Sequence, residues 1–373
     1  MTLHVICLDQ PYPPTYGGAV DMYYKLKALH DAGIGLILHI FLYHGKEEDA
    51  LRGIAKEIHY YPRRTGLIRQ LSLLPFSIRS RDDSRLLDDL LKDSHPILFE
   101  GIQSCFPLAD KRLKDRKKIV RMHNVEHEYF RRFAASCPWG MKRFYYTMEA
   151  LKLRHFERIL AHADRILPIT EADTAYYRQR FPHNDVRLLN CFFDTSHDNS
   201  AGNIGGEEKP YILYHGNLSI IENIKTVHYL ISDIAPHLPE GMRLIIAGRR
   251  PSGKMMHTAE HTNHVEIIHD PSEEKMDSLI SKAHINLLLT FQPTGIKLKL
   301  LNSLWKGQGH CLVNSPMLHG NSLGTLCHKA DSTEDILTTI TALMKRQPSS
   351  EELKARREAI MEMGFNNIRN IIE

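Results

Sequence analysis

The chain has 373 residues, 42% of them hydrophobic and 25% charged, with a formal net charge of +4. This length suits about two domains of ~150 residues, each with its own hydrophobic core. The near balance of 48 Lys and Arg against 44 Asp and Glu gives no indication of the concentrated basic face that nucleic-acid binding needs. It leaves room for local basic patches that meet phosphate or anionic lipid.

The spacing of the cysteines and the length of the apolar runs indicate in which compartment the protein works. The six cysteines are scattered without a C-x-x-C pair, which is typical of buried free thiols in a reducing environment. The N-terminal residues lack the charged start and long apolar stretch of a signal peptide, and no run reaches the ~18 apolar residues of a membrane span. We therefore expect a cytoplasmic protein.

Short apolar runs alternate with longer helical patterns along the chain. The predicted strands of the first half are 3–8, 35–43, 57–61, 96–100, 117–122, 165–169 and 186–190. Those of the second half are 211–216, 243–248, 265–269, 285–289, 310–314 and 324–328. Apolar runs separated by helices are typical of parallel sheets built from βαβ units.

The segment between the two halves is rich in Ser, Asn, Gly and charge, and it has no apolar period. We predict an α/β chain with two Rossmann-like open parallel-sheet domains facing each other across a cleft. Their ranges are 1–193 for the N-terminal domain, 194–209 for the linker, 210–348 for the C-terminal domain and 349–373 for a final helical segment. Because the last segment opens with a capping-box pattern, we expect an amphipathic helix over 349–372. This helix is a candidate for packing back on the N-terminal domain.

The first candidate site follows the predicted strand 3–8. Gly17 and Gly18 stand in PPTYGGA, just before a helical pattern. A loop at this place presents backbone N–H groups to an anion or a sugar. The alternative is that these glycines only permit a turn with positive φ.

The second candidate is RMHNVEHEYF, residues 121–130, which contains the H-x-x-E-H pattern of a family of zinc peptidases. That site requires His123 and His127 one turn apart on one helix face. The strand predicted over 117–122 instead places His123 at its carboxyl end. There, His123 and Glu126 suit hydrogen bonding to a polyhydroxylated ligand, without a metal, and His127 is structural. The alternative is that His123 only caps local structure.

Two further candidates carry cations in the second half. Arg249 and Arg250 end the predicted strand 243–248, where an arginine can meet phosphate. Gly295 opens a predicted helix whose first turn holds Lys297 and Lys299. Lysines there are unfavourable with the helix dipole unless an anion is present, so they indicate a phosphate site.

Two stretches interleave basic and apolar residues. For 61–81, which lacks clean periodicity, insertion into an anionic membrane surface and packing on the domain are equally open. For the helical stretch 141–160 we expect the apolar face to pack on the domain. The protein is thus expected in the cytoplasm, and peripheral contact at the inner face of the membrane through 61–81 is one of the two open alternatives for that segment.

Several segments, in order, resemble retaining glycosyltransferases of the GT-B fold, in particular a subgroup of family 4 that contains an HNVE segment. They are PPTYGGA at 13–19, HNVEHEYFRR at 123–132, HADRILPITEADTAYY at 162–177, YHGNLSIIENIKTVHYLI at 214–231, LIIAGRRP at 244–251 and GIKLKLLNSLWKG at 295–307. The resemblance spans nearly the whole chain.

It implies transfer of a sugar from a nucleotide-sugar donor, a UDP- or GDP-sugar, to a saccharide or lipid-linked acceptor. No metal or other cofactor is required, and the configuration is retained. The donor would lie on the C-terminal domain, near Gly216, Asn217, Arg249, Gly295, Lys297, Lys299 and Asn302. The acceptor would lie near Gly17, Gly18 and His123, with His123 and Glu126 as the candidate catalytic residues.

The chain departs from the family pattern at four places. The family commonly has two glutamates where this chain has Thr294 and Asn302, and its phosphate-binding Arg and Lys fall at Asn217 and Glu222. The alternative is therefore a catalytically weak GT-B protein that binds a nucleotide-sugar or glycan without turnover. A GT-B epimerase fits the architecture but not the HNVE segment, and the zinc peptidase ranks last.

Overall fold

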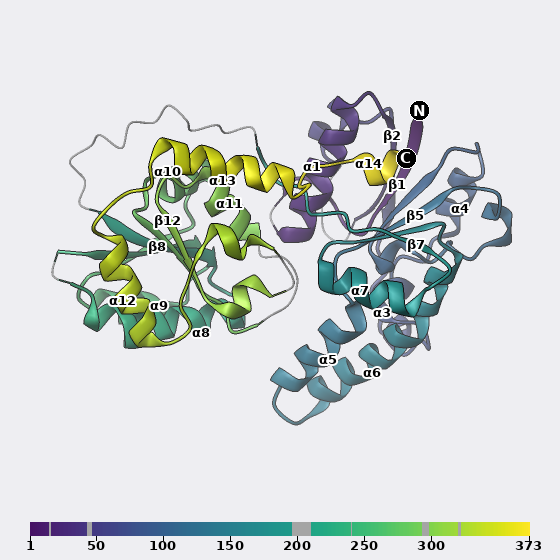
Figure 1. Ribbon diagram of the computed structural model, residues 1–373. Coiled ribbons are helices and arrows are strands. Elements are labelled where there is room, and N and C mark those ends of the chain that lie inside the picture. Colours follow the sequence, from purple (N-terminus) through teal and green to yellow (C-terminus); the bar gives the residue numbers. More distant parts are fainter. Residues whose placement is uncertain (15, 43–46, 196–209, 240, 293–297, 320–321) are drawn as a thin grey trace. The chain divides into compact units, whose positions relative to one another are not determined.

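The protein is described here by a computed structural model of residues 1–373, except 15, 43–46, 196–209, 240, 293–297 and 320–321 (Figure 1). The described chain divides into two compact units. Unit 1 comprises Met1–Phe193 and Gly364–Glu373, and unit 2 comprises Asp194–Met363. Most of the predicted linker 194–209 lies outside the described residues.

Unit 1 is built on a seven-stranded parallel sheet with the order β3-β2-β1-β4-β5-β6-β7. Its strands are β1 (Thr2–Cys7), β2 (Gly35–Leu42), β3 (Glu57–Pro62), β4 (Ile97–Glu100), β5 (Lys118–Met122), β6 (Arg165–Pro168) and β7 (Asp185–Val186). The central strands are apolar on both faces, as expected for a sheet that helices cover on both sides.

Successive strand residues pack into two separate cores. On one face, Val5 and Leu38 contact Met22 and Leu26 of α1 (Gly17–Asp31), and Ile371 of α14 (Arg369–Ile372) joins them. Leu51 of η1 (Asp49–Gly53) packs on this face as well. The other face is covered by further helices of the unit. These are α3 (Phe76–Arg79), α4 (Ser84–Leu90), η2 (Ile102–Ser104), η3 (Lys111–Leu113), α5 (Glu126–Ser136), α6 (Met141–Phe156), η4 (Glu157–His162) and α7 (Glu171–Arg180). The short helix α2 (Leu67–Gln70) precedes α3 in the chain.

Unit 2 repeats this plan with a six-stranded parallel sheet of order β10-β9-β8-β11-β12-β13. Its strands are β8 (Tyr211–Asn217), β9 (Arg243–Arg249), β10 (Val265–His269), β11 (Ile285–Leu288), β12 (His310–Val313) and β13 (His328–Lys329). Its helices are α8 (Ile221–Tyr229), η5 (Leu230–Ile234), η6 (Ala235–His237), α9 (Gly253–Glu260), α10 (Glu273–Lys282), α11 (Leu298–Lys306), η7 (Ser315–Leu318), η8 (Leu323–Leu326), α12 (Thr333–Leu343) and α13 (Ser350–Glu362).

In each sheet the strand order reverses once, between β1 and β4 and between β8 and β11. In open α/β sheets, ligands bind outside the carboxyl ends of the strands at such a reversal. The predicted fold class, two Rossmann-like open parallel sheets, is confirmed.

Three predicted elements are corrected. Only Asp185–Val186 of the segment around 186–190 is a strand, because the carbonyl groups of Leu189 and Asn190 accept from the Arg121 guanidinium instead of from another strand. Within 324–328 a 3-10 turn takes most of the residues. The helix predicted over 349–372 is interrupted at Gly364, whose φ is 81°, so that α13 belongs to unit 2 and α14 to unit 1.

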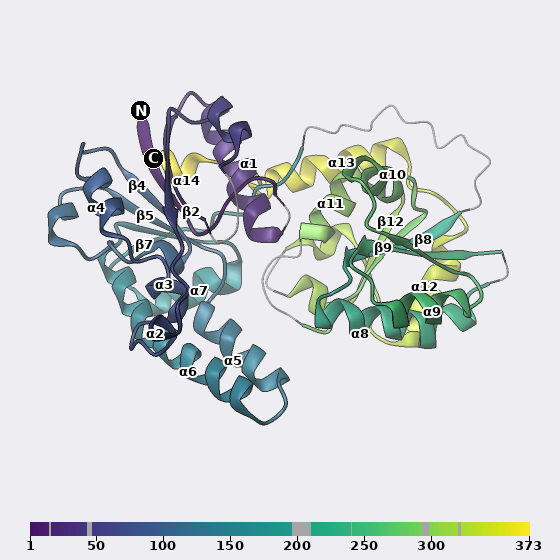
Figure 2. The same cartoon turned by 180° about the vertical axis from the view of Figure 1, so that it is seen from behind.

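The helix pair α5 and α6 projects from the rest of unit 1 in two opposite views (Figures 1 and 2). Within the part of the chain that the structure describes, no helix is both long and apolar enough to cross a membrane.

Candidate functional site

Two of the predicted elements of unit 1 meet at the carboxyl edge of its sheet. His123 follows directly after β5, and α1 begins at Gly17 after an extended Tyr16. A methyl group added to Gly18 would lie 3.0 Å from the Tyr16 ring and 3.8 Å from Nδ1 of His123. The structure therefore brings Gly18 and His123 together, with the first turn of α1 beside the imidazole.

Beneath His123 lies a buried cluster of four charged side chains. Lys25 Nζ lies 2.9 Å from carboxylate oxygens of both Asp21 and Glu100. Arg121 donates to Asp21 at 3.0 Å. All four are at most 1% exposed. Because two cations face two carboxylates, the cluster is balanced, as a buried set of charges must be.

The cluster keeps both carboxylates ionised. Burial by itself would raise the pKa of Asp21, but Arg121 and Lys25 outweigh it and hold that pKa well below its usual range. Burial likewise opposes ionisation of Glu100, yet Lys25 and the hydrogen bond from His123 lower its pKa. Each carboxylate is therefore available as a fixed negative acceptor.

Glu100 orients the His123 ring. Nε2 of His123 donates to the Glu100 carboxylate at 3.1 Å, and the ring is 11% exposed. With Nε2 held by Glu100, the other ring nitrogen, Nδ1, is the one that lies beside Gly18. This arrangement presents Nδ1 at the sheet edge, where it can hydrogen-bond a ligand hydroxyl.

Glu126 is the first residue of α5 and is buried. Burial raises the pKa of its carboxyl group, and the hydrogen bonds from Asn124 and Gln103 offset this only in part. A carboxyl group with a raised pKa at a helix start is suited to proton transfer. His127 lies on α5 with Nδ1 3.3 Å from Glu157. Since His123 lies between β5 and α5 and His127 lies on α5, they do not share the helix face that the zinc-peptidase pattern requires.

In unit 2, Gly216 and Asn217 end β8, and Asn217 pairs with Arg249 at the end of β9. The Asn217 side chain accepts from the backbone N–H and hydroxyl of Ser219 at 3.0 and 2.7 Å. It therefore shapes the loop that leaves the strand. Arg249 is exposed at the same edge, and thus adds a cation beside this loop.

Lys299 and Asn302 lie on α11, and both are half-buried. Nζ of Lys299 lies 3.4 Å from the Tyr214 hydroxyl and 4.6 Å from the centre of its ring. His215 next to Tyr214 is buried, and burial together with the charge of Lys299 lowers its pKa to about 3. Lys299 is thus a held cation beside a neutral imidazole. Gly295 and Lys297 lie outside the described residues, as does Thr294.

A pocket of about 360 Å³ opens at the carboxyl ends of β11 and β12 in unit 2. Its lining combines aromatic rings with polar groups, namely Tyr229, Leu289, Phe291, Asn314, Asp331, Ser332, Thr333 and Ile336. The Tyr229 and Phe291 rings meet edge to face at 5.8 Å. A larger cavity, of about 640 Å³, lies beside β3 and contains no predicted site residue. The smaller pocket is the better candidate for a ligand site because it lies at the carboxyl edge of a parallel sheet, where ligands bind.

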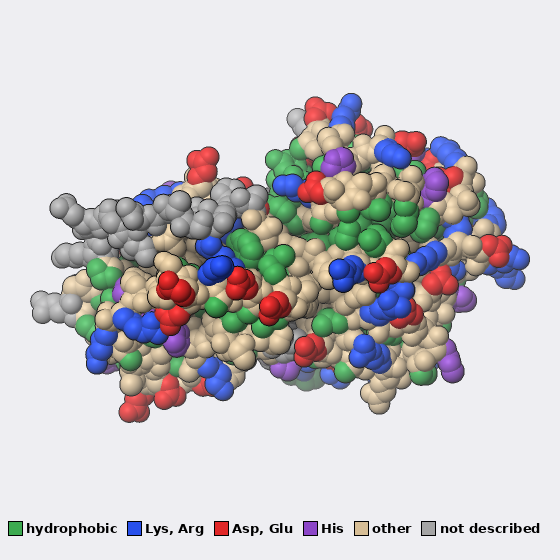
Figure 3. Space-filling view, turned by 45° about the horizontal axis from the view of Figure 1, so that its top comes forward, with side chains coloured by type: hydrophobic (Ala, Val, Ile, Leu, Met, Phe, Trp, Pro, Cys, Tyr) green, Lys and Arg blue, Asp and Glu red, His purple; other side chains and the backbone are tan. Residues whose placement is uncertain are grey.

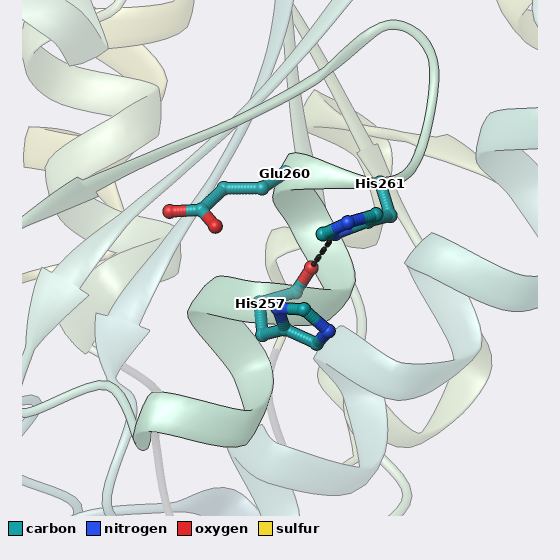
Figure 4. A group of neighbouring side chains, drawn as sticks. All are labelled: His257, Glu260 and His261. Carbon is teal, nitrogen blue, oxygen red and sulfur yellow. Dashed lines mark hydrogen bonds between the residues drawn. The ribbon is translucent and has the colours of Figure 1, made fainter.

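Two groups among the described residues have the composition and spacing of a metal site. In the first, Asp21, Glu100 and His123, the carboxylates already face Lys25 and Arg121, so a further cation would be repelled. The second comprises exposed His257, Glu260 and His261 at the end of α9 (Figure 4). Nδ1 of His261 bonds to the His257 carbonyl at 2.8 Å, which leaves Nε2 free to coordinate a metal.

The predicted sites omitted the buried charges that orient His123. Asp21 and Lys25 were visible as a pair four residues apart on a predicted helix, and Glu100 as the last residue of a predicted strand. Their partnership with Arg121, 100 positions from Asp21, becomes visible only in the folded chain.

The chain resembles several known proteins. A comparison with known protein families finds no match. An uncharacterised 44.6 kDa protein in the cps region of Klebsiella pneumoniae is 25% identical over 321 residues, which is 80% of this chain and 79% of that protein.

Among solved structures, the Anabaena HepE protein in complex with UDP and glucose matches with a TM-score of 0.66 at 10% identity, over 100% of this chain and 97% of that one. A UDP-forming trehalose-phosphate synthase from Burkholderia xenovorans, in complex with glucose-6-phosphate, also has a TM-score of 0.66 at 10% identity, over 98% and 97% of the two chains. WaaG, a glycosyltransferase involved in lipopolysaccharide biosynthesis, matches at 0.63 and 12% identity, over 97% and 95%. Two parallel sheets and full-length similarity to these structures show that the chain has the GT-B fold of glycosyltransferases.

Proposed function

We propose that this chain is a retaining glycosyltransferase of the HNVE-containing subgroup of family 4. It moves a sugar from a nucleotide-sugar to a saccharide or lipid-linked acceptor in surface polysaccharide or glycolipid synthesis. The observation that carries this proposal is the placement of His123 and Arg249 at the carboxyl edges of two parallel sheets. The complex of HepE with UDP and glucose and the role of WaaG in lipopolysaccharide biosynthesis support it, as does the cps region of the Klebsiella relative.

Unit 2 is the proposed donor side. The reaction requires stabilisation of a departing nucleoside diphosphate, which cations and helix N-termini supply. Arg249 and Lys299 would supply the charge, with Lys297 and Gly295 completing the phosphate site. Asn302 would hydrogen-bond the ribose, and Gly216 and Asn217 would shape the loop beneath the donor, a UDP- or GDP-sugar. No metal is required in this scheme.

Unit 1 is the proposed acceptor side, with Gly17 and Gly18 lining it. Nδ1 of His123, oriented by Glu100, would accept a hydrogen bond from a sugar hydroxyl, and Glu126 would meet the same substrates. In the front-face reaction, the acceptor oxygen bonds the anomeric carbon while the bond from that carbon to the diphosphate breaks. The hydroxyl proton passes to the leaving diphosphate. The protein would act in the cytoplasm, at the inner face of the membrane, with 61–81 as contact.

One observation favours the alternative of a binder with weak turnover. Glu222 lies in the first turn of α8, directly after the β8 loop. A carboxylate there opposes a diphosphate. Such a protein would bind the nucleotide-sugar and release no product.

The test follows thermal stability and turnover together. A nucleoside diphosphate that binds the folded chain raises Tm by mass action. We expect UDP or GDP, and one of their sugar conjugates, to do so, and Lys299→Ala and Arg249→Ala to abolish the rise. Lys345→Ala, at an exposed lysine of unit 2, is the matched control. Absence of any shift with the wild-type chain contradicts the proposal.

Turnover separates the enzyme from the binder. Slow release of nucleoside diphosphate from a bound sugar conjugate, lost in Lys299→Ala, supports transfer. A Tm rise with no release, even after prolonged incubation with candidate acceptors, supports the binder.

A further inference from the structure

One face of α6 is apolar and exposed to solvent. Met141, Phe144, Met148 and Leu151 are exposed by 83%, 62%, 38% and 56%. Their spacing of three and four residues places them on a single stripe of the helix. Trp139, 88% exposed, extends this stripe into the turn between α5 and α6. A stripe of this size on an otherwise ordinary surface marks an interaction site.

Two more exposed leucines lie beside α6. Lys152 Nζ of α6 lies 3.5 Å from the carbonyl of Gln70, and Glu149 accepts from the backbone N–H of Phe76 at 2.7 Å. The segment between them therefore runs along the helix. Its Leu71 and Leu73 are 86% and 95% exposed. We call the set Leu71, Leu73, Trp139, Met141, Phe144, Met148 and Leu151 the α6 patch.

The opposite face of α6 is already used for packing. Ala150 and Leu153 are buried, and Tyr146 packs against Phe133 of α5 with ring centres 4.6 Å apart. The packing expected for 141–160 is thus confirmed for this face only. Since α6 contributes to the core of unit 1 through this buried face, the core does not need the α6 patch, which stays exposed to solvent.

Cations are concentrated in the two segments that carry the α6 patch. From Tyr129 to Phe156 the sequence has six Lys and Arg and a single carboxylate, Glu149, and from 62 to 81 it has five Arg and no Asp or Glu. Carboxylates just outside these segments neutralise part of this charge, since Glu128 lies near Arg131 and Arg132, and Asp82 and Asp83 pair with Arg79 and Arg64. Lys142 and Arg154 of α6 are exposed. Glu149 is 2% exposed and paired with Lys152 at 2.9 Å. On the face shown in Figure 3, by contrast, cationic and anionic side chains are interspersed.

We propose that the α6 patch docks the chain onto an anionic lipid bilayer. Its exposed Trp, Phe, Met and Leu side chains suit the boundary between headgroups and acyl chains. The surrounding Lys and Arg are attracted to anionic headgroups. Two copies of the chain meeting through this surface would place cations against cations, which disfavours self-association.

The place of the α6 patch suits a lipid-linked acceptor, a point that rests on the proposed function. Helix α5 connects the candidate site with the α6 patch. Its first residue, Glu126, lies at the candidate site, and its last residue, Ser136, precedes the turn that carries Trp139. A helix of 11 residues spans about 16 Å at 1.5 Å per residue. The docked bilayer surface would therefore lie within about two nanometres of His123, close enough for an acceptor anchored in it.

The experiment uses the full chain with phosphatidylcholine vesicles, with and without phosphatidylglycerol. The chain has two tryptophans, so Trp305→Phe leaves Trp139 as the only one. Its fluorescence is expected to shift to the blue with phosphatidylglycerol vesicles only. In co-sedimentation, Trp139→Ser/Met141→Ser/Phe144→Ser is expected to lose at least about tenfold in affinity. Phe106→Ser/Met361→Ser, at exposed apolar residues elsewhere, is the matched control.

Two charge-reversal double variants test the electrostatic part of the proposed binding. Lys142→Glu/Arg143→Glu is expected to weaken binding, and most strongly at low salt, whereas Lys282→Glu/Lys345→Glu in unit 2 leaves it unchanged. Tm of each variant, measured with and without nucleoside diphosphate, shows that folding and donor binding are intact, so this test and that of the proposed function fail separately.

Three results would overturn the inference. They are equal binding by the triple-serine variant and the wild type, equal binding to uncharged vesicles, and absence of vesicle binding. Self-association that the triple-serine variant loses would assign the α6 patch to a second copy of the chain.

Discussion

The buried charges under His123 can be unbalanced by one substitution, Lys25→Met. The methionine keeps most of the lysine stem but removes the charge that contacts Asp21 and Glu100 at 2.9 Å. Two buried carboxylates then share the single guanidinium of Arg121. The fold around His123 depends on this balance, so stability reports directly on the arrangement.

The magnitude follows from the burial of the partners. Removing one member of a buried ion pair costs about 3–5 kcal/mol of the free energy of unfolding. For a domain of this size, each kcal/mol shifts Tm by about 2–4 °C, so we expect a fall of about 6–20 °C. Because Lys25 acts to lower the pKa of Glu100, its loss raises that pKa. Protonation of Glu100 then reduces the deficit as the pH falls.

Differential scanning calorimetry measures the fall, with Lys27→Met on the same helix as the control, since Lys27 is half-exposed. The double variant Lys25→Met/Glu100→Gln restores a balanced pair, Asp21 with Arg121, and is expected to recover at least about 1 kcal/mol relative to additivity. The reasoning is refuted if Lys25→Met costs no more than Lys27→Met, or if the double variant shows the sum of the single losses.

Three further predictions concern pH, packing and the acceptor side. Burial lowers the pKa of His39 well below its ordinary value, so the unfolded chain binds a proton at this residue more tightly than the folded chain does. The free energy of unfolding therefore declines as the pH falls below about 6.5. Urea titrations at pH 7.5 and 5.5 should show a smaller decline for His39→Gln than for the wild type. Gly248→Ala places a methyl group 1.8 Å from a backbone oxygen of β8 and should cost at least about 2 kcal/mol in urea unfolding, whereas Gly253→Ala, with nothing within 4 Å, should cost less than about 0.5 kcal/mol; equal costs would contradict this. Gly18→Ala should reduce transfer several-fold, because the added methyl group lies 3.0 Å from the Tyr16 ring and 3.8 Å from Nδ1 of His123. Unchanged transfer in this variant would remove Nδ1 of His123 from the acceptor site.

The sequence by itself determined the architecture. Every predicted strand overlaps an observed one, because a strand buried on both faces is written locally as a short apolar run between helices. The position of His123 at a strand end also followed from local pattern, since the apolar run before it stops at Met122. The predictions were poorer for 186–190 and 324–328, where buried or half-buried apolar residues lie in turns and loops, and local pattern cannot distinguish such segments from strands.

Only the tertiary structure decided what surrounds the candidate site. Asp21, Glu100 and Arg121 come from α1, β4 and β5, and no local pattern records that these elements place their charges in one buried cluster. The same holds for α6, whose sequence shows apolar residues on two faces but not which face the domain covers. Burial is a property of the packed chain: the sequence supplied the residue types, and the fold decided which of them meet each other, a ligand or solvent.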